Sequence, residues 1–350
     1  AFLLFSCAGN TDRAKNGVKI TATDAKTEQT EEYNDAVFSM TIPKGWKVTY
    51  GGSDIYHSIR ISDPDEPLNC MFVLLKADCL LHSQEGKDAW KAVYNEGNRD
   101  AVIFANAPVL EKPSTESFFK IFAQYADMAS KFEAAYVGYS FPHYDNFTVT
   151  DRFSASGDMV KYSLGDEFLR ATFTDNGRAG EGMFSASVVD FKESLYSDRT
   201  VADYGLESVD SGYYMAYNIV AITAAKDTFI EWEDLLTECL KTLKYSDIFE
   251  NNIRGAIERD FFQARCINQN FNQTMDGIMS SWDSRNKSID IISQKQSDAT
   301  LGYERVYDTR TKEIYRAAKG FTSSYKGKGY KPVTDDNMYT TPISGYIEKD

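Results

Sequence analysis

The sequence predicts an α+β protein in which a mostly antiparallel sheet is packed with helices, followed by a long helix and a small β-hairpin. Three observations predict this class. Short segments alternate apolar and polar residues with period two, which is typical of half-buried strands. Other segments repeat apolar residues every three or four positions, which is typical of helices. The order along the chain is strands, helices, antiparallel strands and a closing helix.

The strands are predicted from alternation and from the turns between them. Phe38, Met40 and Ile42 alternate with polar residues, and Pro43-Lys44-Gly45 is a turn signal after which the alternation resumes. The triplet Asp175-Asn176-Gly177 predicts a hairpin turn. Further strands are predicted over 59–61, 70–75, 147–154, 167–173, 183–191 and 213–225, the last as a central strand. Tyr303, Arg305 and Tyr307 share one face of a strand, which with 313–317 forms the predicted hairpin.

Four segments have helical periodicity. Two cover 83–95 and 228–243, and a third follows Pro113, with Ser114 or Thr115 as its N-cap. In the fourth, 253–282, the apolar steps average 3.6 residues, which predicts one helix of roughly 45–50 Å. Its single apolar stripe predicts packing along another surface of the protein, with a partner-binding or dimerising helix as the alternative.

The start of the chain predicts where the protein is located. Leu4-Phe5-Ser6-Cys7 resembles a bacterial lipobox, in which the cysteine receives the lipid, and a polar stretch follows it. We therefore expect residues 1–7 to be a signal-peptide remnant and 8–35 a flexible tether with a reach of roughly 30 Å. This makes the protein exported and lipid-anchored to the bacterial membrane, on its extracellular or periplasmic face. A chance cysteine beside a buried strand end is the alternative.

The segment Phe38-Ser39-Met40-Thr41-Ile42-Pro43-Lys44-Gly45-Trp46 resembles the opening strand of the PsbP/Mog1-like superfamily. Leu243-Lys244-Tyr245-Ser246, after the closing helix, resembles the end of the same domain. The resemblance covers 36–246 and implies a largely non-enzymatic binding or assembly role. The remaining 247–350, a long helix with a small β region, resembles segments of uncharacterised exported bacterial proteins.

Charge is distributed unevenly along the chain. The formal net charge is −14, which argues against a nucleic-acid binder. Residues 282–350 hold 12 Lys/Arg and 10 Asp/Glu, so they carry +2 and the rest carries −16. Their basic, aromatic segment 325–331 is either a solvated glycine turn or a contact for anionic wall polymer, glycan or lipid headgroups. Aromatic and arginine side chains suit sugar or peptide recognition. We expect a ligand groove where five such side chains could converge: Trp282, Arg285, Tyr303, Arg305 and Tyr307.

Catalytic and metal motifs are not found. His57, His82 and His143 form no HExxH pair, there is no GxSxG elbow, and neither a metal nor a cofactor is predicted. Cysteines 70, 79, 239 and 266 are predicted to be buried thiols, with a Cys70–Cys79 disulfide as the alternative.

Together these patterns predict a non-enzymatic, lipid-anchored envelope protein with a binding or assembly role. Its expected partners are the membrane, through Cys7, and an envelope protein or glycan. The alternatives are a glycan or wall-polymer binder and, further behind, a carboxylate-dependent hydrolase. The oligomeric state is not predicted.

Overall fold

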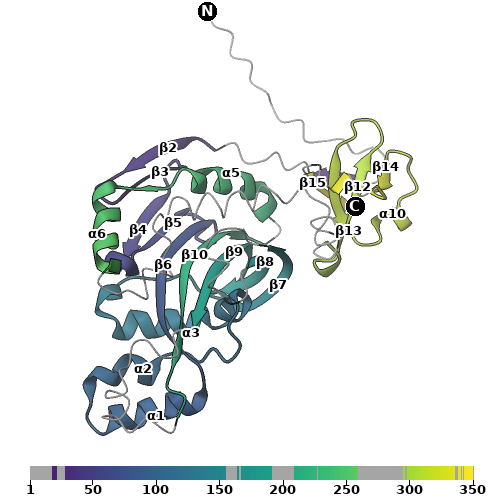
Figure 1. The fold of residues 1–350 in the computed structure, drawn as a ribbon. Coiled ribbons are helices and arrows are strands. Elements are labelled where there is room, and N and C mark those ends of the chain that lie inside the picture. Colours follow the sequence, from purple (N-terminus) through teal and green to yellow (C-terminus); the bar gives the residue numbers. More distant parts are fainter. Residues whose placement is uncertain are drawn as a thin grey trace, which may run out of the picture. The chain divides into compact units, whose positions relative to one another are not determined.

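The computed structural model divides the chain into two compact units, Glu28–Ser284 and Arg285–Asp350 together with Ala1–Thr27. We call them the large unit and the C-terminal unit and describe each by itself (Figure 1). The structure describes residues 18–21, 28–154, 164, 167–190, 209–226, 228–258, 295, 298–335, 338–339, 341 and 343–349. The α+β class with mostly antiparallel sheets is confirmed.

The large unit is built on a seven-stranded sheet with the order β4-β5-β6-β10-β9-β8-β7. All neighbours are antiparallel, and β10 is central, as predicted. Asn176 and Gly177 both have positive φ, 51° and 77°, and form the predicted two-residue turn between β8 and β9. The strands are β4 (Lys47–Gly51), β5 (Ser58–Ser62), β6 (Cys70–Leu81), β7 (Asp145–Ser154), β8 (Glu167–Asp175), β9 (Arg178–Asp190) and β10 (Tyr213–Ala225).

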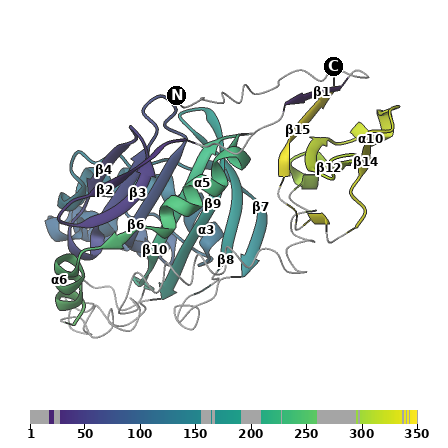
Figure 2. The same ribbon diagram turned by 90° about the horizontal axis from the view of Figure 1, so that it is seen from above.

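Both faces of this sheet are covered. Phe72 on one face packs with Phe118 and Phe122 of α3 (Thr115–Phe132). Met71 and Val73 point to the other face, where the covering layer consists of α5 (Phe229–Lys241) and a small sheet, as Figure 2 shows for α5. The small sheet has the order β11-β3-β2, with β2 (Thr30–Asn34), β3 (Phe38–Pro43) and β11 (Lys244–Tyr245).

Two of the sequence predictions concern α3 and α6 (Asp247–Glu258). The Ser114 side chain accepts a hydrogen bond from the Ser117 N–H and caps α3, as predicted. The helix α6 covers the first six residues of the long helix predicted over 253–282, and the rest of that prediction lies outside the described residues. The short elements are η1 (Asp54–Tyr56), α1 (Gln84–Asn95), η2 (Arg99–Ala101), α2 (Val102–Asn106) and η3 (Ala134–Tyr136).

The C-terminal unit contains a five-stranded sheet with the order β1-β15-β13-β12-β14. The predicted hairpin is β12 with β13, and β13 pairs in parallel with β15. At the far edge, β1 pairs antiparallel with β15 along four residue pairs. The elements are β1 (Val18–Thr21), β12 (Tyr303–Asp308), β13 (Ile314–Ala318), α10 (Phe321–Ser324), β14 (Tyr330–Pro332) and β15 (Ile343–Lys349).

Two strands, β1 and β2, lie inside the range 8–35 that was predicted to be a flexible tether, so this prediction is wrong for them. The polar composition of 8–35 indicates only that this segment cannot form a hydrophobic core by itself. An edge strand needs only backbone partners, and β15 and β3 supply these while other residues supply the core. The borders of the two units accordingly differ from the predicted divisions at 36 and 247.

Three of the five cysteines are described, and all three are buried free thiols. The alternative of a Cys70–Cys79 disulfide is wrong. Both residues belong to β6, and nine residues of strand separate them by roughly 25–30 Å, whereas a disulfide needs Cα atoms within about 7 Å. Cys239 is buried in α5, and Cys7 and Cys266 lie outside the described residues.

Candidate functional site

The predicted ligand groove is only partly described. Tyr303, Arg305 and Tyr307 lie on β12 with side chains to the same face, whereas Trp282 and Arg285 lie outside the described residues. Tyr303 and Tyr307 are half-buried, but only 4% of Arg305 is exposed. The described part of the chain therefore places three of the five residues, and of these three Arg305 is buried.

Arg305 is engaged inside the C-terminal unit. Its Nε donates to Asp298 Oδ2 at 2.6 Å, and its Nη1 donates to the Tyr339 carbonyl at 3.1 Å. Arg316 Nε lies 2.8 Å from Asp298 Oδ1 on the other side of the carboxylate. Burial lowers the pKa of Arg305, and the Asp298 carboxylate opposes this shift. Arg305 is therefore a structural residue here, because its donors are used within the fold.

Exposed cations cluster at one end of the five-stranded sheet of the C-terminal unit. Arg310 and Lys312 lie in the turn between β12 and β13, and Lys326, Lys328 and Lys331 lie in and beside the loop before β14. All five side chains are exposed. We call these five residues the basic end.

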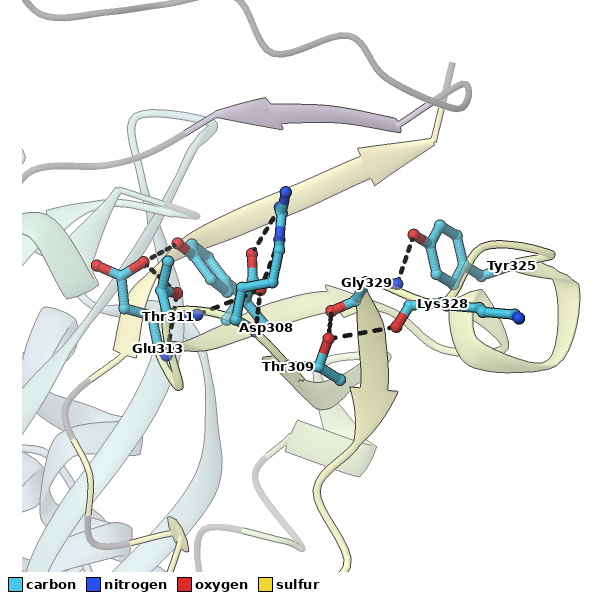
Figure 3. A network of polar contacts seen from close by, with 9 residues as sticks. Asp308, Thr309, Thr311, Glu313, Tyr325, Lys328 and Gly329 are labelled. Atoms are coloured by element: carbon cyan, nitrogen blue, oxygen red, sulfur yellow. Dashed lines mark hydrogen bonds and ion pairs between the residues drawn. The ribbon is translucent and has the colours of Figure 1, made fainter.

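The two segments of the basic end are joined through Thr309 (Figure 3). The Thr309 N–H donates to the Gly329 carbonyl at 2.8 Å, and its hydroxyl donates to the carbonyls of Lys328 and Gly329 at 3.3 and 3.1 Å. The Gly329 N–H donates to the Tyr325 hydroxyl at 3.3 Å. A Cβ at Gly327 would lie 2.2 Å from the same hydroxyl oxygen, so a side chain there would displace the Tyr325 ring. These contacts fix the backbone that carries the lysines.

Two carboxylates near the basic end, Asp308 and Glu313, already accept hydrogen bonds within the fold. Asp308 is buried, and it accepts hydrogen bonds from the N–H groups of Arg310 and Thr311. Burial alone would raise the pKa of Asp308, but hydrogen bonds, first of all from Arg310, hold it below its usual value. Glu313 accepts from the hydroxyls of Thr311 and Tyr315. The basic end therefore presents more positive than negative charge to its surroundings.

A second polar cluster, which sequence reasoning missed, lies inside the large unit. Lys76 is fully buried on β6, with Nζ 3.1 Å from Asp78 Oδ2 and 5.0 Å from the Tyr56 ring centroid. The Tyr56 hydroxyl donates to the same Asp78 oxygen. Cys79 has φ 61°, and the register between β6 and β10 shifts beside it, which marks a bulge that re-aims these side chains. The signal in the sequence was a lysine and an aspartate inside an otherwise apolar strand.

Glu133, just after α3, belongs to this cluster. Its pKa is raised to about 7, first by burial and then by the Asp78 carboxylate, while Lys76 opposes the shift. Glu133 Oε1 and Asp78 Oδ1 are buried without a hydrogen-bond partner among the described residues. The described residues contain no group of three or more side chains placed to hold a metal ion. The chemistry available here is the uptake and release of a proton.

This cluster predicts a pH dependence of stability. The folded-state pKa of Glu133, about 7, exceeds the ordinary glutamate value of 4.5, so the contribution of Glu133 to stability is complete below pH 4.5 and is lost as the pH rises through 7. Because the side chain is half-buried, we expect Glu133→Gln to be more stable than wild type by about 2 kcal/mol at alkaline pH and no more stable in acid. Urea unfolding at both pH values measures this. Exposed Glu111→Gln is the control, and equal pH profiles for Glu133→Gln and wild type would contradict the prediction.

Two of the three histidines, His57 and His82, are held by contacts inside the large unit. His82 is buried, with Nδ1 2.9 Å from Asp210 and Nε2 3.2 Å from Asp190, so it links the end of β9 to the residues before β10. His57 packs against the Phe249 ring, and burial lowers its pKa to about 4. Neither arrangement includes a described nucleophile hydrogen-bonded to the ring.

The chain was also compared with known proteins. No family model matches it, and no curated protein matches it either. Among the described residues, no helix combines the length and apolar character needed to span a membrane.

Proposed function

We propose that the protein is a non-enzymatic, lipid-anchored protein of the bacterial cell envelope that binds an anionic partner through its basic end. The observation that carries the binding role is the set of five exposed cations on a backbone fixed by Thr309, Tyr325 and Gly329. Lysine and arginine stay protonated at neutral pH, so such a surface attracts anions and does not transfer protons. This favours binding over catalysis.

The large unit supports an assembly or binding role within this proposal. We propose that 36–246 has a PsbP/Mog1-like fold and that a long helix follows over 253–282. Support comes from β3 with the Gly45-Trp46 turn after it, from an antiparallel sheet covered on both faces, and from α5 followed directly by β11. An envelope protein is the expected partner of this unit.

The anchor is proposed at Cys7 on the strength of the lipobox-like Leu4-Phe5-Ser6-Cys7. We expect bacteria that express the complete precursor to incorporate a fatty-acid analogue into the wild-type protein and not into Cys7→Ala. Labelling is read by gel fluorescence after purification. The variant's protein level, measured by immunoblot, is the control for expression. Labelling that persists in Cys7→Ala would refute the anchor.

A second candidate function is the binding of a glycan or wall polymer. It is favoured by the half-buried rings of Tyr307 and Tyr325 beside the cations of the basic end, because an aromatic face suits a sugar ring and a cation suits its acidic substituents. Native affinity gels containing acidic or neutral polysaccharide distinguish glycan binding from binding to an anionic partner through charge alone. Retardation by a neutral polysaccharide would favour this function, and free migration through every polymer would remove it.

A further inference from the structure

We infer that the anionic partner of the basic end is the lipid headgroup surface of the same membrane that holds Cys7. The inference rests on the proposed function, because it takes the lipid on Cys7 as given. Three properties of the C-terminal unit support it: the position of β1, the length of chain between Cys7 and β1, and the charge of the basic end.

The position of β1 ties this unit to the membrane anchor. β1 pairs with β15 from Val18 to Thr21, so the first described strand after Cys7 is part of the C-terminal unit. Cys7 and Val18 are 11 residues apart. Whatever their conformation, 11 residues span at most about 40 Å. Val18, and with it the β1 edge of the C-terminal sheet, therefore stays within that distance of the lipid-bearing Cys7.

The same length of chain allows the basic end to reach the headgroups. β1 and β14 are the two edges of the five-stranded sheet, and four strand spacings put them about 19 Å apart. The loop that carries Lys326 and Lys328 directly precedes β14. Since the chain to Cys7 can extend to about twice the width of the sheet, either edge can face the lipid. The tether restricts the unit to the surface without preventing the contact.

The charge of the basic end matches an anionic surface. No carboxylate of the described residues forms an ion pair with Lys326, Lys328 or Lys331, so their ammonium groups are available to phosphates. A basic side chain close to an anionic leaflet strengthens binding about fivefold. A short tether raises the effective concentration of headgroups to the millimolar range, which adds to the binding that the cations provide by themselves. The half-buried Tyr325 ring adds an amphipathic group of the kind that lies at headgroup level.

The test uses the full chain as Cys7→Ser, so that no lipid contributes to binding. We expect it to co-sediment with vesicles containing phosphatidylglycerol at low salt, to be released by high salt, and not to bind pure phosphatidylcholine vesicles. Replacing Lys326, Lys328 and Lys331 together by glutamine is expected to weaken binding about 100-fold. The matched control replaces three exposed lysines of the large unit, Lys44, Lys47 and Lys244, by glutamine and keeps wild-type binding.

The outcomes separate this inference from the anchor itself. Failure of the Cys7→Ser protein to bind phosphatidylglycerol vesicles, or equal weakening in both triple variants, overturns the membrane contact. Binding to an acidic wall polymer with none to vesicles also overturns it and assigns the basic end to the polymer. Fatty-acid labelling tests only the lipid on Cys7, and vesicle binding by the Cys7→Ser protein tests only the membrane contact. Each hypothesis can therefore be refuted without the other.

Discussion

Replacement of Asp298 by alanine is expected to unfold the C-terminal unit. The carboxylate lies between the guanidinium groups of Arg305 and Arg316, and all three side chains are at most 4% exposed. Without it, two buried cations face each other with no counter-charge between them, and removing one partner of a buried pair costs about 3–5 kcal/mol. Since a small sheet has little stability to spare, a loss of this size exceeds what the unit can tolerate.

Differential scanning calorimetry of the full chain measures this effect. The transition of the C-terminal unit is expected to disappear or move far down in temperature, while the transition of the large unit stays in place as the internal control. Combining Asp298→Ala with Arg316→Met removes one of the stranded cations and is expected to restore part of the loss. An Asp298→Ala protein with the wild-type calorimetric profile would show that the buried triad contributes no stability.

The second large effect is expected at Lys76. Lys76→Met keeps the apolar stem but removes the ammonium that faces Asp78 and opposes the raised pKa of Glu133. Two carboxyl groups then share a buried site with no cation, and we expect a loss of about 3 kcal/mol at neutral pH, at the lower end of the range because Asp78 is 15% exposed. The loss shrinks in acid, where the carboxyls are protonated and neutral.

Urea unfolding of Lys76→Met at neutral and acid pH tests this prediction. Lys76→Met combined with Asp78→Asn is the matched rescue, because it removes the cation and its partner together. We expect the double variant to be more stable than Lys76→Met at neutral pH. Equal stability of Lys76→Met and wild type at neutral pH would mean that the buried ammonium does not stabilise the cluster.

The elements of the large unit were predictable because local signals determine them. Alternation in Phe38–Pro43, the Asn176-Gly177 turn and the Ser114 cap each depend on a few neighbouring residues, and each is confirmed. Local patterns do not report which strands pair across the chain. For this reason the pairing of β1 with β15 was missed and its residues were assigned to a tether.

The site was less predictable than the fold for a related reason. Whether an arginine binds a ligand or supports the fold depends on what tertiary structure places beside it. Arg305 alternates with two tyrosines like a binding residue, but Asp298 and Tyr339 take up its donors. The loop before β14 was recognisable as basic and aromatic from its composition. Its fixed backbone depends on Thr309, which belongs to a different segment of the chain.

The pairing of β1 with β15 also determines when the C-terminal sheet can be completed during synthesis. The ribosome makes β1 first and β15 after about 320 further residues, which takes tens of seconds at usual elongation rates. During that time the backbone groups of β1 have no strand partner, while the intervening 28–284 can already fold. A chain released before residue 343 would leave β1 unpaired, so this sheet forms in full only after β15 has been synthesised.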